Sequence, residues 1–122
     1  MITVRLLRTP SGFPRRITAT GHAGYAKKEN EDIICAAVSA IVQTAVGGLQ
    51  DVAGFDPDYT LENGRIACGV PDPGKLDPRT LEMVRIIMET TAVWLKQIEL
   101  SYGSKYVLVQ EAAYTEKEGA AS

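Results

Sequence analysis

The chain has 122 residues, of which 45% are hydrophobic and 23% are charged, with a formal net charge of −2. This length suits one domain with a core of its own. The balanced charge argues against direct nucleic-acid binding by a basic surface. Two cysteines are too few for a disulfide framework, so we expect reduced thiols in the cytoplasm. We expect no signal peptide and no membrane contact, since no apolar run is predicted to reach the roughly 18–20 residues of a bilayer span.

The predicted elements begin with two strands. Residues 1–8 (MITVRLLR) and 15–22 (RRITATGH) alternate apolar and polar positions, and a Pro-Ser-Gly break separates them. This pattern predicts a hairpin. The alternation places His22, the single histidine, at the end of the second strand on its polar face.

A loop and a helix follow. Residues 23–31 hold few apolar side chains and are expected to form an exposed, mobile loop. Asp32 is a good N-cap for the helix that follows. The helix sequence IICAAVSAIVQTAVGGLQDVAG is apolar or small on nearly every side of its first turns, so we expect burial of more than one face.

The clearest local signal lies in residues 58–70 (DYTLENGRIACGV). Asn63-Gly64 between two strand-like runs is typical of a type I′ hairpin turn. Asp77-Pro78 then opens a second helix, which Tyr102-Gly103 is expected to end.

A last strand is predicted over residues 105–110 (KYVLVQ), and the polar residues 111–122 are expected to form a flexible tail. Residues 1–110 then form a single domain with the order ββαββαβ. This order predicts an α+β fold of two layers, a mostly antiparallel five-stranded sheet with two helices on one face.

Cys35 is the candidate nucleophile. It is the third residue of the predicted first helix, where free N–H groups and the helix dipole favour a thiolate. Asp32 is positioned to accept from the Cys35 N–H, but its negative charge opposes the thiolate. The net effect on the thiol is left open by the sequence.

His22 is the base available to Cys35, because the chain has one histidine. The loop of residues 23–31 can bring His22 to the start of the helix, because the entropic cost of closing a loop rises slowly with its length. A Cys–His pair within hydrogen-bond reach is the minimum for acyl transfer. First-turn N–H groups are candidate oxyanion donors. The alternatives remain open: a cysteine in an alanine-rich helix is usually a small buried hydrophobe, and a histidine after a strand is usually a surface residue.

Three further patterns bear on the site. Ser39 lies one turn after Cys35 and either bonds back to the helix backbone or faces the site. Cys68 lies within a predicted strand without an activating neighbour and is expected to be structural. The sequence has no cluster of metal-ligand residues and no phosphate-binding loop.

Two adjacent motifs carry a resemblance. The segments GHAGYA, from Gly21, and DIICAAVS, from Asp32, resemble the signature of the ribosomal-processing cysteine protease family Prp. The likeness extends along the chain, through the Asn-Gly hairpin and the long second helix. It implies a cysteine endopeptidase with a Cys–His dyad, with Cys35 as nucleophile and His22 as general base, and with Asp32 and Ser39 in supporting roles.

The resemblance also implies a substrate and partners. The expected substrate is the N-terminal extension of a large-subunit ribosomal protein of the L-twenty-seven family, cut after an aromatic residue during ribosome maturation. A homodimer is implied, as is the absence of any cofactor or metal. The residues assigned to substrate binding or to a lid are Gly21, Ala23, Gly24, Tyr25 and Asn30.

Asn30 stands where the family usually has glycine, and asparagine tolerates a positive φ. Two other functions stay open. One is a ribosome-associated binding module without catalysis. The other is a redox switch that pairs Cys35 with Cys68.

Overall fold

The computed structural model describes residues 1–24 and 32–116. Its elements follow the predicted order ββαββαβ, with one short 3₁₀ helix added before the second helix. Their bounds are β1 Ile2–Arg8, β2 Pro14–Thr20, α1 Ile33–Asp51, β3 Asp58–Glu62, β4 Arg65–Gly69, η2 Pro73–Lys75, α2 Pro78–Tyr102 and β5 Val107–Ala113.

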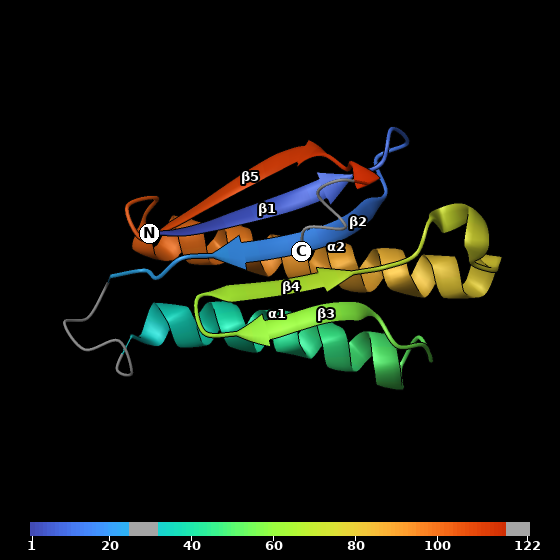
Figure 1. Cartoon of the computed structure of the whole chain (residues 1–122), viewed down its shortest axis with the longest axis horizontal. Helices are drawn as coiled ribbons and strands as arrows, with labels where there is room; N and C mark the ends of the chain where they lie inside the picture. The colour runs from blue at the N-terminus through green and yellow to red at the C-terminus, as the bar shows by residue number, and fades with distance from the viewer. Residues whose placement is uncertain (25–31, 117–122) are drawn as a thin grey trace.

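The five strands form one mixed sheet in the order β3-β4-β2-β1-β5 (Figure 1). The pairs β1–β2, β2–β4 and β3–β4 are antiparallel, and β5 runs parallel to β1 at one edge. The parallel pair requires a crossover connection. The chain reaches β5 from β4 through the long helix α2, which lies against the sheet. The predicted two-layer α+β fold is confirmed.

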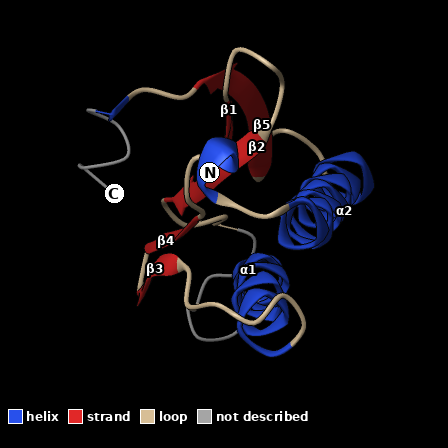
Figure 2. Cartoon of the chain, turned by 90° about the vertical axis from the view of Figure 1, so that its right-hand side faces the viewer, coloured by secondary structure: helices blue, strands red, loops and turns tan. Residues whose placement is uncertain are grey.

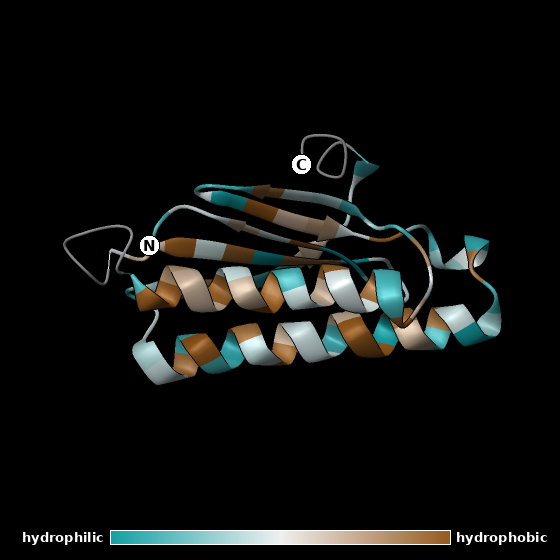
Figure 3. Cartoon of the chain, turned by 90° about the horizontal axis from the view of Figure 1, so that it is seen from below, coloured by the Kyte–Doolittle hydropathy of each residue, from teal (hydrophilic) through white to brown (hydrophobic). Residues whose placement is uncertain are grey.

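Both helices cover the same face of the sheet (Figure 2). They lie side by side beneath it, with apolar residues recurring along each (Figure 3). The core between the layers takes one stripe from each helix, at helical spacing. These buried residues are Ile34, Val38, Val42, Ala45, Val46 and Leu49 of α1, and Val84, Met88, Thr91, Ala92 and Leu95 of α2.

The composition of α1 departs from one expectation. The helix has 19 residues, and a window of 18 of them has a mean hydropathy of 1.7, so by length and composition alone this helix could span a membrane. The core helix of a globular protein meets the same criterion. In this fold, the buried stripe of α1 packs in the core beneath the sheet.

The turn between β3 and β4 lies at Asn63-Gly64 as predicted, but its predicted type is wrong. Type I′ requires a positive φ at both central residues. Among the described residues only glycines have a positive φ, and Gly64 has φ 79°. A positive φ at the second central position alone is the type II pattern.

The strand β2 is shorter than predicted. It ends at Thr20, and Gly21 follows with φ 95°. That left-handed conformation breaks the alternation of the strand. The sequence pattern predicts His22 at the end of this strand. In the structure it lies beyond the strand instead.

The last strand continues past its expected end at Gln110. β5 includes Glu111–Ala113, and the Tyr114 N–H then donates to the Arg8 carbonyl over 2.8 Å. The sheet therefore holds the first residues assigned to the tail. Residues 117–122 lie outside the described residues.

Candidate functional site

A cavity of about 330 Å³ opens between the N-terminal half of α1, the end of β2 and the β3–β4 hairpin. It brings together His22 and Cys35, the two residues predicted to carry the chemistry. Apolar side chains form much of its wall, and polar groups gather toward α1 and the hairpin turn. The lining residues are Ile2, Ala19, Gly21, His22, Cys35, Val38, Ser39, Gln43, Leu61, Glu62, Asn63, Gly64 and Ile66.

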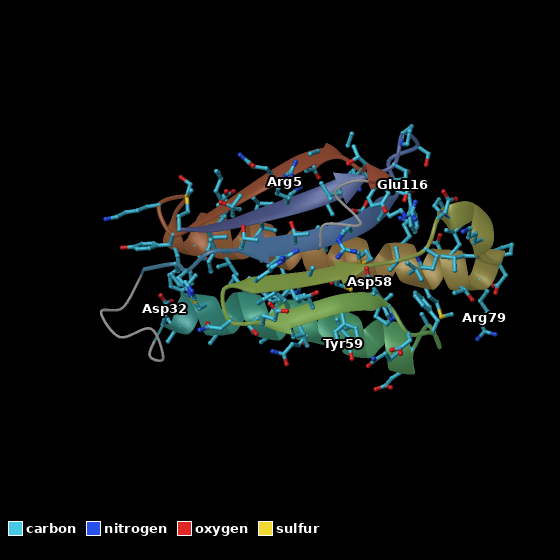
Figure 4. The ribbon with its side chains drawn as sticks, viewed as in Figure 1. Arg5, Asp32, Asp58, Tyr59, Arg79 and Glu116 are labelled. Atoms are coloured by element: carbon cyan, nitrogen blue, oxygen red, sulfur yellow. The ribbon has the colours of Figure 1, made fainter. Side chains whose placement is uncertain are left out.

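The first turn of α1 positions Cys35. Asp32 lies at the N-terminal end of this helix (Figure 4), where it is buried. One oxygen of its carboxylate, Oδ1, accepts from the N–H groups of Ile34, at 3.0 Å, and Cys35, at 3.1 Å. The predicted N-cap is therefore confirmed. It also means that these two first-turn donors are already bonded and do not stand open for an oxyanion.

The Cys35 sulfur has a backbone donor of its own. The N–H of Ala23 lies 3.4 Å from Cys35 Sγ and donates to it. A hydrogen bond of this kind stabilises negative charge on the acceptor. The thiol itself is half-buried, so it is open to the cavity while being held on one side.

Two backbone contacts hold the segment that carries His22. The Gly21 N–H donates to the carbonyl of Gly64 over 2.9 Å. On the other side, the N-terminal ammonium of Met1 donates to the His22 carbonyl over 2.6 Å. The segment is thus tied both to the hairpin turn and to the start of β1, while the His22 side chain lies at the exposed rim of the cavity.

The residues assigned to substrate binding or a lid have different environments. Gly21 is required by backbone geometry: a Cβ there would lie 2.5 Å from the Met1 carbonyl oxygen. Ala23 is 3% exposed and packs in the core, which corrects its place in an exposed loop. Gly24 is exposed with φ 69°. The predictions for Tyr25 and Asn30 lie outside the described residues.

Ser39 faces the cavity one turn beyond Cys35 and accepts a hydrogen bond from Gln43 Nε2 at 2.8 Å. Of the two alternatives for Ser39, this favours the one in which its side chain faces the site over the one in which it bonds back to the helix backbone. Gln43 itself was missed, although the spacing of four residues repeats once more along the same helix face.

The hairpin wall was missed as well. Asn63-Gly64 was singled out as a turn, but nothing local in the sequence indicates that this turn borders the site. Its position follows from the pairing of β4 with β2, in which Arg65 lies opposite Thr20. That register brings the turn beside Gly21 and His22.

Cys68 lies in β4 within the core and is 1% exposed. Burial raises the pKa of its thiol to about 12, with the nearby Asp58 carboxylate adding to this and Arg16 opposing it. A thiol with such a pKa stays protonated and unreactive at neutral pH. These findings agree with a structural role for Cys68. Within residues 1–24 and 32–116, no group of three or more His, Cys, Asp and Glu side chains is placed to hold a metal.

Comparison with known proteins gives a consistent result. Residues 1–107 match the family described as cysteine protease Prp. A relative from Bacillus subtilis (strain 168), the ribosomal processing cysteine protease Prp, is 34% identical over 85 residues, which cover 68% of this chain and 73% of that protein.

Two crystal structures of an essential ribosomal processing protease Prp from S. aureus have the same fold. The one with a covalently linked product peptide has a TM-score of 0.78 and 23% identity, and covers 92% of this chain and 100% of the other. The one with a substrate peptide has a TM-score of 0.73 and 20% identity, with the same coverage.

Proposed function

Because this chain belongs to the cysteine protease Prp family, we propose that it is an endopeptidase in which Cys35 and His22 form the catalytic dyad. His22 takes the thiol proton, and Cys35 Sγ attacks the carbonyl carbon of the scissile bond. The carbon–nitrogen bond then breaks as His22 returns the proton to the leaving amine. Water hydrolyses the resulting thioester and releases the acid product.

The observation that carries this proposal is the shared cavity. Cys35 comes from α1 and His22 from the segment that follows β2, and both border it. Ala23, the residue after His22, donates its N–H to the Cys35 sulfur. The same N–H is a candidate donor to the oxyanion once the sulfur has bonded to the substrate, since Ile34 and Cys35 already give theirs to Asp32.

The supporting residues follow from their contacts. Asp32 fixes the backbone of the first turn and thereby the direction of the Cys35 side chain. Ser39, together with Gln43, offers hydrogen bonds to the backbone of a bound peptide from the same wall of the cavity. Gly21 turns the chain so that His22 reaches the cavity rim.

For the substrate, we propose the N-terminal extension of a large-subunit ribosomal protein of the L-twenty-seven family, cut during ribosome maturation in the cytoplasm. The relative from Bacillus subtilis is called a ribosomal processing protease, and an S. aureus structure holds a substrate peptide. The apolar wall formed by Ile2, Leu61 and Ile66 suits an apolar or aromatic side chain beside the scissile bond.

We propose in addition that the chain forms a homodimer through its helical face. A groove of about 460 Å³ lies between α1 and α2, and nearly all of its lining is apolar. Trp94 in this groove is 57% exposed and Ile86 is 50% exposed. Contiguous exposed apolar surface of this kind marks interaction sites. Light scattering should give twice the chain mass, and Trp94→Glu should give the mass of one chain.

The central experiment measures cleavage of a peptide that spans the junction of the extension. Cys35→Ala and His22→Ala should each abolish turnover. Cys68→Ala is the matched control, because it removes the other thiol, and should retain it. Turnover by Cys35→Ala would overturn the proposal. Binding of the peptide by the intact chain without any turnover would instead favour the binding module.

A further inference from the structure

The turn between β3 and β4 lies against the imidazole of His22. A Cβ built on Gly64 would lie 2.9 Å from His22 Nε2, 3.3 Å from Cε1 and 3.8 Å from Cδ2. The ring thus extends over this one residue of the turn. Only a residue without a side chain leaves the ring this space, and its φ of 79° also favours glycine.

The backbone reinforces this contact. The carbonyl of Gly64 accepts from the N–H of Gly21, the residue before His22, over 2.9 Å. The neighbouring strand pair ends at Thr20 and Arg65. The turn therefore holds the backbone of the segment that carries His22 and borders its ring.

We propose that Gly64 is a positioning residue for His22: the absence of a side chain at the β3–β4 turn sets where the imidazole lies relative to Cys35. This inference rests on the proposed dyad and extends it. It assigns a role to a residue 42 positions from His22 along the chain, outside both motifs that carry the family resemblance.

The physical reason is steric. An alanine Cβ does not approach a ring nitrogen to 2.9 Å, so either the ring or the turn must move. The turn is fixed by the strand pairing on both sides of it, whereas the ring rotates about its side-chain bonds. We therefore expect the imidazole to move. A misplacement of about 1 Å in a reacting group costs on the order of 100-fold in rate.

The experiment compares Gly64→Ala with Gly54→Ala. Gly54 has φ 81°, nearly the same as Gly64, and a Cβ there would meet no atom within 4 Å. Both variants thus place alanine in a left-handed conformation, but only Gly64→Ala pushes on His22. Melting temperatures should fall by similar amounts in the two variants.

Three readouts then isolate the position of His22. As the chain has one histidine, its ring signals in NMR spectra are unambiguous; they should shift in Gly64→Ala and stay in place in Gly54→Ala. The pH profile of Cys35 alkylation by iodoacetamide should change in Gly64→Ala alone. The kcat/KM for the peptide should fall about tenfold or more, mainly through kcat.

Gly64→Asn separates the two causes further, since asparagine tolerates a positive φ but still carries a Cβ. It should fold at least as well as Gly64→Ala and show the same shifted ring signals. Ring signals and an alkylation profile like those of Gly54→Ala, in either Gly64 variant, would overturn the inference. Those two readouts need no peptidase activity, so they decide the role of Gly64 even if the proposed function fails.

Discussion

Replacing Asp32 with alanine removes the acceptor on which the first turn of α1 depends. Asp32 Oδ1 accepts from Ile34 at 3.0 Å and from Cys35 at 3.1 Å, and the side chain is buried. Loss of an N-cap costs about 1 kcal/mol. Ile34 is 0% exposed, so water cannot replace its lost partner. A buried N–H without an acceptor costs about 2 kcal/mol more. The expected loss is therefore about 3 kcal/mol in the free energy of unfolding.

The matched control is Asp77→Ala, which removes the N-cap of α2. Asp77 accepts from the Thr80 N–H over 2.9 Å, but this bond is exposed and water can take over. Its loss should cost about 1 kcal/mol. In urea unfolding followed by circular dichroism, Asp32→Ala should therefore lose about 2 kcal/mol more than Asp77→Ala, which corresponds to a melting temperature roughly 8 °C lower. Equal losses would refute the reasoning that burial sets the cost.

The two cysteines and Gly69 differ in their surroundings in ways that can be measured. At neutral pH, iodoacetamide should label Cys35, which borders the cavity, well before Cys68, which is 1% exposed; mass spectrometry of the digested protein would show the reverse order if the assignment is wrong. The pKa of Cys68 is raised by burial from 9.0 to about 12, so the folded chain binds more protons than the unfolded chain between these values. The free energy of unfolding should fall as pH rises through that range, by up to about 4 kcal/mol, and Cys68→Ala should remove this part of the alkaline loss. Gly69→Ala places a methyl group on the guanidinium of Arg16 and should cost about 1–3 kcal/mol. Gly47→Ala is the control: its Cβ meets no atom within 4 Å, so it should stabilise α1 by about 1 kcal/mol. A Gly69→Ala variant that calorimetry finds stabilised would contradict the contact with Arg16.

Local signals in the sequence were enough to predict the order of the helices and strands. The structure confirms the predicted N-cap Asp32 and the predicted start of the second helix at Asp77-Pro78. The Asn63-Gly64 pair correctly marks a hairpin. Capping, periodicity and turn preference act over a few residues, so a short window of sequence contains them.

Some of the differences arise because neighbouring strands decide what the local pattern leaves open. The β5 strand runs on to Ala113 because β1 offers it partners as far as Arg8. Arg16, on the polar face of β2, is 3% exposed and pairs with Asp58 of β3 at 3.0 Å. Alternation predicts which way a side chain points, but not whether another strand covers it.

The candidate site divides along the same line. The Cys35 side is local: the cap lies three residues away in sequence, and the Ala23 donor lies twelve away. The Asp32 cap was accessible to sequence reasoning, but the Ala23 donor was not, because the sequence pattern placed Ala23 in an exposed loop. The motif resemblance covers both Cys35 and His22. The His22 side depends on Gly64, a residue that only the β2–β4 register brings near.

This division has a consequence for how the site forms. α1 carries its own cap and can present the thiol as soon as it packs on the sheet. The segment that carries His22 gains its bond to the Gly64 carbonyl, and the imidazole its place beside Gly64, when β4 pairs with β2. A substitution that weakens this pairing should therefore separate His22 from Cys35 before it unfolds α1. In such a variant, peptidase activity should be lost at a lower denaturant concentration than the helix signal. In variants with substitutions in the contact between α1 and α2, activity and helix signal should be lost at the same denaturant concentration.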